Sequence, residues 1–191
     1  MDNEKAFELL ETSGALLSGH FLLTSGKHSE RYIQCALLLS RPDLAFEFTR
    51  DIADHFVHEN IDVVAAPAVG GIVVSYEVGR LLGRKAVFLE RENGLMSLRR
   101  GFEIEEGENV LIVEDVITTG SSVIEVGEAI KNAGGHVAGY SSLVNRSSGR
   151  FNPDRPYYFS VQMDIPVYSQ GECPLCQKGI PFVKPGSKDL K

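Results

Sequence analysis

The hydrophobic residues of this chain alternate between two spacings, and that alternation restricts its fold more than any other feature. Short apolar runs occur at 63–67, 86–89, 110–113 and 136–144. Between them lie segments whose apolar residues recur every three or four positions. Strands that alternate with helices in this way are typical of an α/β protein, in which helices flank a mostly parallel sheet.

The helical segments have recognisable starts and stops. In the first, Leu44, Phe48, Ile52 and Phe56 recur every four residues behind Pro42, a residue that suits the first turn of a helix. Glycines follow the other helical segments, as expected for residues that end helices in a left-handed conformation. These two further helices are expected over 70–82 and 123–133.

The chain length of 191 residues suits one globular domain with a full core. Residues 1–40 do not follow the alternation, and their short helix and turn-rich, strand-like remainder predict a hood over the sheet. The α/β core is expected over 41–163. Residues 164–191 are rich in proline and glycine, which predicts an extended tail. The polar segment 90–109 predicts a long exposed loop or a mobile hairpin.

The net charge of -7 disfavours a nucleic-acid-binding protein, because such proteins carry a basic face. The longest mostly apolar run, 63–74, is interrupted by proline and glycine, so we expect neither a membrane span nor a signal peptide. Three cysteines, an odd number, argue against a disulfide framework and predict a reducing compartment. We therefore expect a cytoplasmic protein that acts on small molecules.

The segment Val-Leu-Ile-Val-Glu-Asp-Val-Ile-Thr-Thr-Gly-Ser-Ser at 110–122 carries the clearest chemistry. A buried strand ends in two acids, and a loop of small hydroxyl residues leads into a helix, whose N-terminal N–H groups can bind phosphate. Carboxylates accept hydrogen bonds from hydroxyl groups, so the combination predicts a sugar phosphate as ligand. The alternative is that Thr and Ser merely cap the helix, which needs only one of them.

This segment resembles the thirteen-residue signature of type I phosphoribosyltransferases, which bind phosphoribosyl diphosphate. The resemblance implies the type I phosphoribosyltransferase fold. It also implies that Glu114 and Asp115 hold the ribose 2′- and 3′-hydroxyls. The loop that would wrap the 5′-phosphate consists of Val116, Ile117, Thr118, Thr119, Gly120, Ser121 and Ser122.

Three features resemble the orotate phosphoribosyltransferases within this family. Purine enzymes with a hypoxanthine- or guanine-type site commonly have a carboxylate where this chain has Thr118, and a neutral hydroxyl there is compatible with the acidic base orotate. The segment 19–29 is similar to the part of the hood that covers the base. Arg146 matches the family arginine that meets orotate, and a guanidinium can bind a carboxylate through two parallel hydrogen bonds.

The chain also departs from those enzymes around the diphosphate. Residues 67–71 follow a strand where the family binds diphosphate through its main chain, but Val69 and Gly70 replace a common aromatic residue and lysine. Thr24 likewise replaces a common lysine. The segment 90–109 lacks the family's K-x-H-G element. The resemblance therefore implies a divergent branch.

Within that segment, Arg99 and Arg100 are the predicted catalytic residues, because their positive charges could replace the missing element beside the leaving diphosphate. The resemblance implies transfer of the phosphoribosyl group from phosphoribosyl diphosphate to orotate, giving orotidine 5′-monophosphate in UMP biosynthesis. It further implies Mg²⁺ bound mainly through the donor, with no metal ligands assigned on the protein, and a homodimer. The alternatives are a purine or uracil phosphoribosyltransferase, or a non-catalytic regulator that senses phosphoribosyl diphosphate.

The pair Cys173 and Cys176 has the C-x-x-C spacing of half a zinc site. Completing it would require Cys35 or a histidine to lie close by. The five histidines show no pair at helical spacing, so the sequence favours structural cysteines over a metal site.

Overall fold

The computed structural model describes residues 1–23 and 25–185, so Thr24 lies outside the described residues. A six-stranded sheet has the order β5-β4-β3-β6-β7-β8, and all neighbours in it are parallel except β4 and β5. Its strands are β3 (Val63–Pro67), β4 (Lys85–Glu92), β5 (Leu95–Leu98), β6 (Asn109–Ile117), β7 (His136–Asn145) and β8 (Tyr157–Gln162). The predicted α/β class is confirmed.

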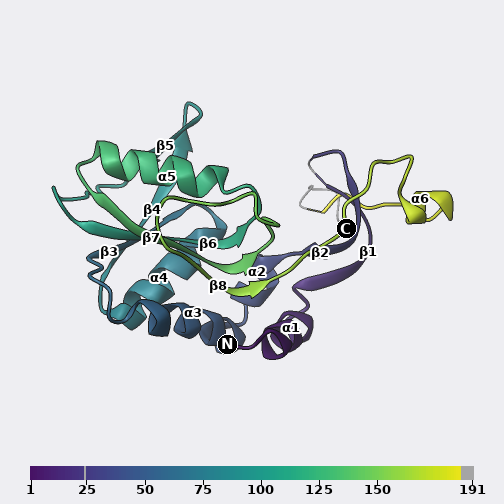
Figure 1. Ribbon diagram of the computed structural model, residues 1–191, viewed down its shortest axis with the longest axis horizontal. Coiled ribbons are helices and arrows are strands. Elements are labelled where there is room, and N and C mark those ends of the chain that lie inside the picture. The colour runs from purple at the N-terminus through teal and green to yellow at the C-terminus, as the bar shows by residue number, and fades with distance from the viewer. Residues whose placement is uncertain (24, 186–191) are drawn as a thin grey trace.

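Helices cover both faces of this sheet (Figure 1). One face packs against α5, and the other packs against α3 and α4. The strand β3 is buried along its whole length, with Val64 and Ala66 facing one core and Val63 and Ala65 facing the other. A strand covered on both faces needs an uninterrupted apolar run, which is why this segment lacks the alternation of a half-exposed strand. The three main helices are α3 (Pro42–Phe56), α4 (Gly70–Leu82) and α5 (Ser121–Asn132).

The first 40 residues form the expected hood beside the sheet (Figure 1). It consists of α1 (Asn3–Thr12) and an antiparallel pair of strands, β1 (Leu16–Leu22) and β2 (His28–Ile33). The short helix α2 (Cys35–Leu39) follows, which the strand-like interpretation of this region missed. No helix of the described residues is long and apolar enough to cross a bilayer.

The tail lies against the hood and includes the short helix α6 (Pro174–Gln177). Its backbone pairs with both hood strands, through Tyr168 with His28 and through Val183 with Phe21. Backbone hydrogen bonds satisfy the polar groups at the edges of a two-stranded sheet, which would otherwise be exposed. The predicted extended tail is thus joined to the hood.

The segment 90–109 is partly a β-hairpin, which protrudes from the sheet (Figure 1). Its turn is Asn93-Gly94, and both residues have a positive φ, 52° and 86°. That conformation is required for the tight turn that suits the right-handed twist of a hairpin. After the hairpin, the chain returns to the sheet and buries Ile104 in the core. The hairpin interpretation is confirmed, whereas the interpretation as one long loop is wrong.

Candidate functional site

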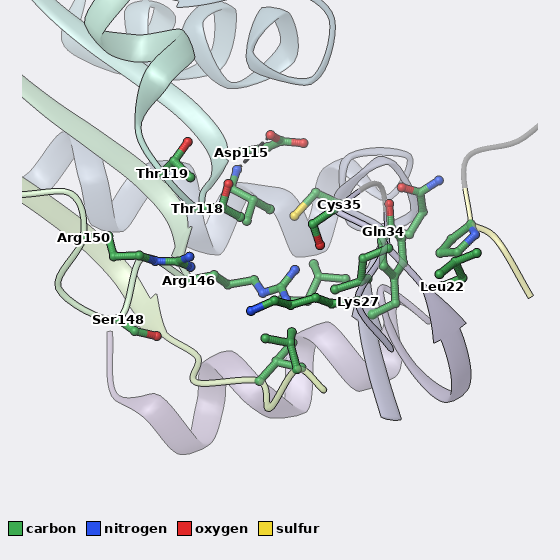
Figure 2. A pocket seen from close by; sticks show the side chains of 18 residues that line it. Leu22, Lys27, Gln34, Cys35, Asp115, Thr118, Thr119, Arg146, Ser148 and Arg150 are labelled. Atoms are coloured by element: carbon green, nitrogen blue, oxygen red, sulfur yellow. Dashed lines mark hydrogen bonds between the residues drawn. The ribbon is translucent and has the colours of Figure 1, made fainter. Parts of the chain in front are cut away.

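A cavity of about 690 Å³ lies between the carboxyl end of the sheet and the hood. Figure 2 shows its walls: Asp115, Thr118 and Thr119 come from β6 and the loop after it, and Lys27 comes from the hood. The tail contributes Val167 to the same cavity. Ligands of open α/β sheets bind at the carboxyl ends of the strands, so this cavity stands where the fold favours a site.

The loop after β6 forms a cradle at the N-terminus of α5. Gly120 precedes the helix with φ +80° and has no side chain to cap it. The Ser121 N–H donates one long hydrogen bond, of 3.4 Å, to Thr119 Oγ1. The first N–H groups of an α-helix have no partner within the helix, so the others here are available to an anion. Capping thus accounts for Thr119 alone among the hydroxyl residues of this loop. The loop encloses a small hollow of about 40 Å³, which Thr118, Thr119 and Ser121 help to line.

Gly120 is required at this point for two reasons. Its left-handed conformation disfavours any side chain. A Cβ at this position would also lie only 2.6 Å from Cε2 of Phe151 and 2.8 Å from its Cγ. The ring of Phe151 packs edge-on against Tyr140 and Tyr157, so it has little room to move away. The cradle therefore depends on a glycine at this residue.

The two acids lie side by side at the edge of the cavity, within β6. The Asp115 backbone N–H donates to Glu114 Oε1 at 3.2 Å, and the Val116 N–H donates to Asp115 Oδ1 at 2.8 Å. Burial raises the pKa of Glu114 to about 9, and the neighbouring charge of Asp115 adds to this rise. Burial also raises the pKa of Asp115. In the ligand-free protein, Glu114 thus holds a proton at neutral pH, and sugar hydroxyls can approach both carboxyl groups.

This raised pKa predicts how stability depends on pH. Glu114 ionises near its ordinary pKa of 4.5 in the unfolded chain but near 9 in the folded protein. The contribution of Glu114 to the free energy of unfolding is fully present below its pKa in the unfolded chain. It is lost as the pH rises toward its pKa in the folded protein, by at most about 1.4 kcal/mol per pH unit. Glu114→Gln should therefore flatten the dependence of the unfolding free energy on pH, measured by urea denaturation between about pH 5 and about pH 8.

The control for this experiment is Glu59→Gln, because the Glu59 side chain is exposed and lies outside the cavity. It should retain the slope of the natural protein. Equal slopes for Glu114→Gln and the natural protein would show that Glu114 ionises alike in the folded and unfolded states.

The turn between β3 and α4 passes directly over the acids. The peptide bond Ala68–Val69 is cis. A Cβ on Gly70 would lie 2.7 Å from Asp115 Cγ, and a Cβ on Gly71 would lie 2.7 Å from the Ala66 Cβ and 3.2 Å from Glu114 Oε1. The two glycines are therefore needed because the main chain runs so close to the carboxyl groups. The sequence suggested a main-chain diphosphate contact here but not this dependence on the acids.

Arg146 enters the cavity from the end of β7, below Thr118 (Figure 2). Its Nε is buried without a hydrogen-bond partner, and no acidic group of the described residues forms an ion pair with it. Burial lowers the pKa of this arginine. A buried cation without a partner is unfavourable, and a carboxylate ligand would compensate it through paired hydrogen bonds.

Two further cations reach the cavity, and the sequence interpretation assigned neither of them a role. Lys27 extends from the hood, and Arg150 extends from the loop after β7, toward Arg146 (Figure 2). Asp115 is the one acid among the described residues that line this cavity. The cavity is therefore suited to anions although the chain as a whole is acidic. The resemblance places the family's common lysine at position 24, three residues before Lys27.

Arg99 and Arg100 do not line this cavity; they lie at the base of the exposed hairpin. Arg100 donates to both carboxylate oxygens of Glu90, at 2.7 and 2.9 Å, and Arg99 lies 3.4 Å from Glu92. Exposed ion pairs of this kind contribute little to stability, so both arginines can exchange these partners for another anion. Within one chain, the structure does not bring them to the other predicted site residues.

Comparisons with known proteins agree with this geometry. A sequence model of the phosphoribosyl transferase domain matches residues 38–175. The orotate phosphoribosyltransferase of Thermoanaerobacter sp. (strain X514) is 50% identical over 98% of this chain and 99% of its own length. That of Pelotomaculum thermopropionicum is 50% identical over the whole of both chains.

Among solved structures, orotate phosphoribosyltransferase of Mycobacterium tuberculosis H37Rv in complex with inorganic phosphate superimposes with a TM-score of 0.68. It is 21% identical, and the match covers 84% of this chain and 96% of that one. At this identity, the likeness shows the fold alone. Taken with the matched domain and the full-length relatives, the cradle, the acid pair and the anion-binding cavity place this chain in the phosphoribosyltransferase family, among the orotate phosphoribosyltransferases.

Proposed function

We propose that this protein transfers the phosphoribosyl group of phosphoribosyl diphosphate to orotate, forming orotidine 5′-monophosphate for UMP biosynthesis. The observation that carries the proposal is the buried, unpartnered Nε of Arg146 in a cavity that adjoins the phosphate cradle. Among nucleobases, a carboxylate is peculiar to orotate, and it is the group that this guanidinium would bind best. The full-length relatives that bear the name orotate phosphoribosyltransferase support the same acceptor.

The arrangement of the cavity fits one orientation of both substrates. The 5′-phosphate would occupy the cradle around Gly120, and the ribose hydroxyls would meet Glu114 and Asp115. Orotate would then lie toward the hood, with its carboxylate on Arg146 and its ring polar atoms near the Thr118 hydroxyl. A carboxylate in place of Thr118 would repel this acidic base, whereas the hydroxyl does not.

The reaction is a displacement at C1 of the ribose. The bond from C1 to the diphosphate oxygen breaks, and the diphosphate leaves with the bonding electrons. N1 of orotate forms the new bond, and its proton passes to water or to the departing diphosphate. Cations around the cavity, Lys27 and Arg150 among them, would stabilise the negative charge of the substrates. Holding both substrates in this orientation supplies much of the rate, because the reacting atoms no longer have to meet by diffusion.

The carboxyl groups of Glu114 and Asp115 could contribute in part to binding Mg²⁺. Asp115 lines the cavity and Glu114 lies beside it, and Mg²⁺ usually binds one or two carboxylates together with substrate phosphates and water. Since both acids would be engaged with ribose hydroxyls, the ion would be held mainly by the donor. When bound, Mg²⁺ neutralises charge on the diphosphate.

We further propose a homodimer in which the hairpin of one subunit serves the site of the other. Val69, which immediately precedes α4, and Val73 and Tyr76 within it recur at helical spacing and are exposed by 81%, 45% and 66%. Such an apolar stripe on a surface helix favours contact with another protein surface. The hairpin protrudes from the sheet (Figure 1), and Arg99 and Arg100 are exposed at its base, where a subunit docked beside the hairpin would meet them.

Loss of the two arginines tests this role. Arg99→Ala with Arg100→Ala should lower kcat by about 100-fold, because positive charge near the leaving diphosphate is lost. Steady-state kinetics would measure this, with Arg50→Ala as control, since Arg50 lies exposed on α3 and pairs with Glu47. Unchanged kcat and Michaelis constants in the double variant would show that these arginines take no part in catalysis.

A mixing experiment tests the shared site. Subunits with both Arg99→Ala and Arg100→Ala should be weakly active, and so should subunits with Asp115→Asn. If each site uses the hairpin of the partner, mixed dimers hold one fully natural site. Random exchange should then restore about a quarter of the natural activity. Activity that stays at the sum of the two parents after subunit exchange would place all the machinery within one chain.

The acceptor itself is tested by incubating the protein with phosphoribosyl diphosphate, Mg²⁺ and one of orotate, uracil, hypoxanthine or adenine. Product analysis should show orotidine 5′-monophosphate and no other nucleotide. A product from uracil or from a purine instead would contradict the proposed function, and no product from any base would favour a regulator. We also place the protein in the cytoplasm, which the three free cysteines support.

A further inference from the structure

Four side chains that the proposed reaction does not use meet between the hood and the tail. His20 lies on β1, His28 opens β2, Cys173 immediately precedes α6, and Cys176 lies within α6. One potential ligand atom from each lies within 4.8 Å of all the others. The relative exposure of Cys173 is 0%, that of His28 is 2% and that of His20 is 4%. Three of the four side chains are therefore sheltered from water, and Cys176 is half-buried.

The fold brings these residues together through two local features. The register of β1 against β2 shifts between Ser18 and Phe21, and such a bulge redirects the side chains within it, here including His20. The tail then pairs by backbone hydrogen bonds with His28 and with Leu22. These contacts place the C-x-x-C segment beside the two histidines, although Cys176 and His28 are 148 residues apart in the chain.

The hydrogen bonds fix the way the His20 ring faces the cluster. Its Nδ1 lies 2.7 Å from the carbonyl oxygen of Ile180, so Nδ1 carries the proton and donates it. The lone pair of Nε2 is then directed into the cluster. Metal-binding histidines commonly donate their second ring N–H to a carbonyl in this manner, which sets the tautomer and the ring orientation.

The ligand atoms have spacings close to those of a tetrahedral site. The distance from His20 Nε2 to Cys173 Sγ is 3.5 Å, and that from His28 Nδ1 to Cys176 Sγ is 3.4 Å. Bonds of Zn²⁺ to nitrogen and sulfur imply edges of about 3.3 to 3.8 Å in a tetrahedron. The two nitrogens, 2.7 Å apart, would separate by about 0.6 Å to admit the ion.

We propose that His20, His28, Cys173 and Cys176 bind a structural Zn²⁺ ion that joins the tail to the hood. Two neutral imidazoles and two thiolates give the bound ion a site of zero net charge, which suits burial. The ring of Phe182 lies edge-on to both histidines, with centroids 5.7 and 5.1 Å away, and it shields the site further. With four protein ligands, the site has no open position for a substrate.

Zinc at this site would also support the substrate cavity. The hood contributes Leu22 and Lys27 to the cavity, and the tail contributes Ile165 and Val167. These two segments meet mainly by short backbone bridges, so a metal crosslink would fix the wall against which the base rests. The zinc proposal does not rest on the proposed function, because metal binding is measured without substrates.

The first test is the metal content of protein produced in medium that contains zinc, iron and other transition metals. About one Zn²⁺ per chain is expected by elemental mass spectrometry. Cys173→Ser, Cys176→Ser and His20→Gln should each reduce that content by at least about 10-fold. The matched controls Cys35→Ser and His58→Gln should keep about one ion per chain, since neither side chain belongs to the cluster.

A second test uses the natural chain and is independent of variant folding. Metal-free protein titrated with Co²⁺ should develop visible absorption of a tetrahedral ion and near-ultraviolet thiolate bands, and one equivalent of Zn²⁺ should remove them. A chelator should expose two additional reactive thiols and lower the melting temperature. Cys176→His, which keeps a ligand atom, should retain Co²⁺ binding where Cys176→Ser loses it.

Four outcomes would overturn the proposal, the first three of which concern the natural protein. These three are natural protein that neither contains zinc nor binds Zn²⁺ or Co²⁺, a disulfide between Cys173 and Cys176 in the freshly purified protein, and another metal in place of zinc. Zinc that persists in both cysteine variants would also do so, because it would then be held elsewhere.

Discussion

Replacement of Gly120 by alanine is expected to lower kcat/KM for phosphoribosyl diphosphate by about 100-fold. The free energy of unfolding should also fall by about 2 to 5 kcal/mol. Part of this loss comes from the left-handed backbone, at φ +80°, and part from overlap of the new methyl group with the Phe151 ring. Relief of that overlap would displace the cradle, and a small displacement weakens every hydrogen bond to the phosphate.

Gly83→Ala separates these two causes. Gly83 has φ +66° at the end of α4, and nothing lies within 4 Å of a Cβ placed there. Its substitution should cost about 1 to 2 kcal/mol of stability without changing the kinetics. Urea denaturation and initial rates against donor concentration measure both effects. Equal kinetic constants for Gly120→Ala and the natural enzyme would mean that the 5′-phosphate binds elsewhere.

Replacement of Arg146 by alanine should reduce kcat/KM for orotate by about 100-fold or more, which corresponds to about 3 kcal/mol. The Nε atom of this half-buried guanidinium is buried and has no partner, so it is ready to pair with the substrate carboxylate. Arg146→Lys should show an intermediate loss of about 10-fold, since lysine keeps the charge but not the fork of parallel donors.

The Michaelis constant for each substrate, measured with the other saturating, checks this assignment. Arg50→Ala is the control, because Arg50 is an exposed residue of α3 that pairs with Glu47. In Arg146→Ala, only the Michaelis constant for orotate should increase. If the constant for phosphoribosyl diphosphate rose instead, Arg146 would serve the donor, and the carboxylate of orotate would need another partner, such as Lys27 or Arg150.

The elements of the sheet could be predicted closely because their signals are local. The run at 63–67 is the strand β3, and the helical spacing at 70–82 is the helix α4. Other elements could not be predicted in this way. The strand β6 continues through Glu114 and Asp115 to Ile117, because pairing with β7 extends it beyond its apolar run. The strand β8 was not expected, and it forms at the sheet edge where β7 offers a partner.

The residues of the site also differ in how far the sequence could predict them. The cradle and the acid pair are contiguous in the chain, so one segment, 110–122, was enough to identify them. Lys27 and Arg150 carry no such signal, because lysines and arginines on loops are most often solvated surface residues. Only folding brings them to one cavity with Arg146 (Figure 2). The need for Gly70 and Gly71 beside the acids likewise depends on packing between β3 and β6.

The sequence by itself therefore determined the α/β class, the phosphate cradle with its acid pair, and the resemblance to orotate phosphoribosyltransferases, since each depends on residues close together in the chain. Only the tertiary structure decided which cations share the cavity and which residues accompany Cys173 and Cys176. Histidines on neighbouring strands have no diagnostic spacing, because the distance between them depends on strand register and on where the tail docks.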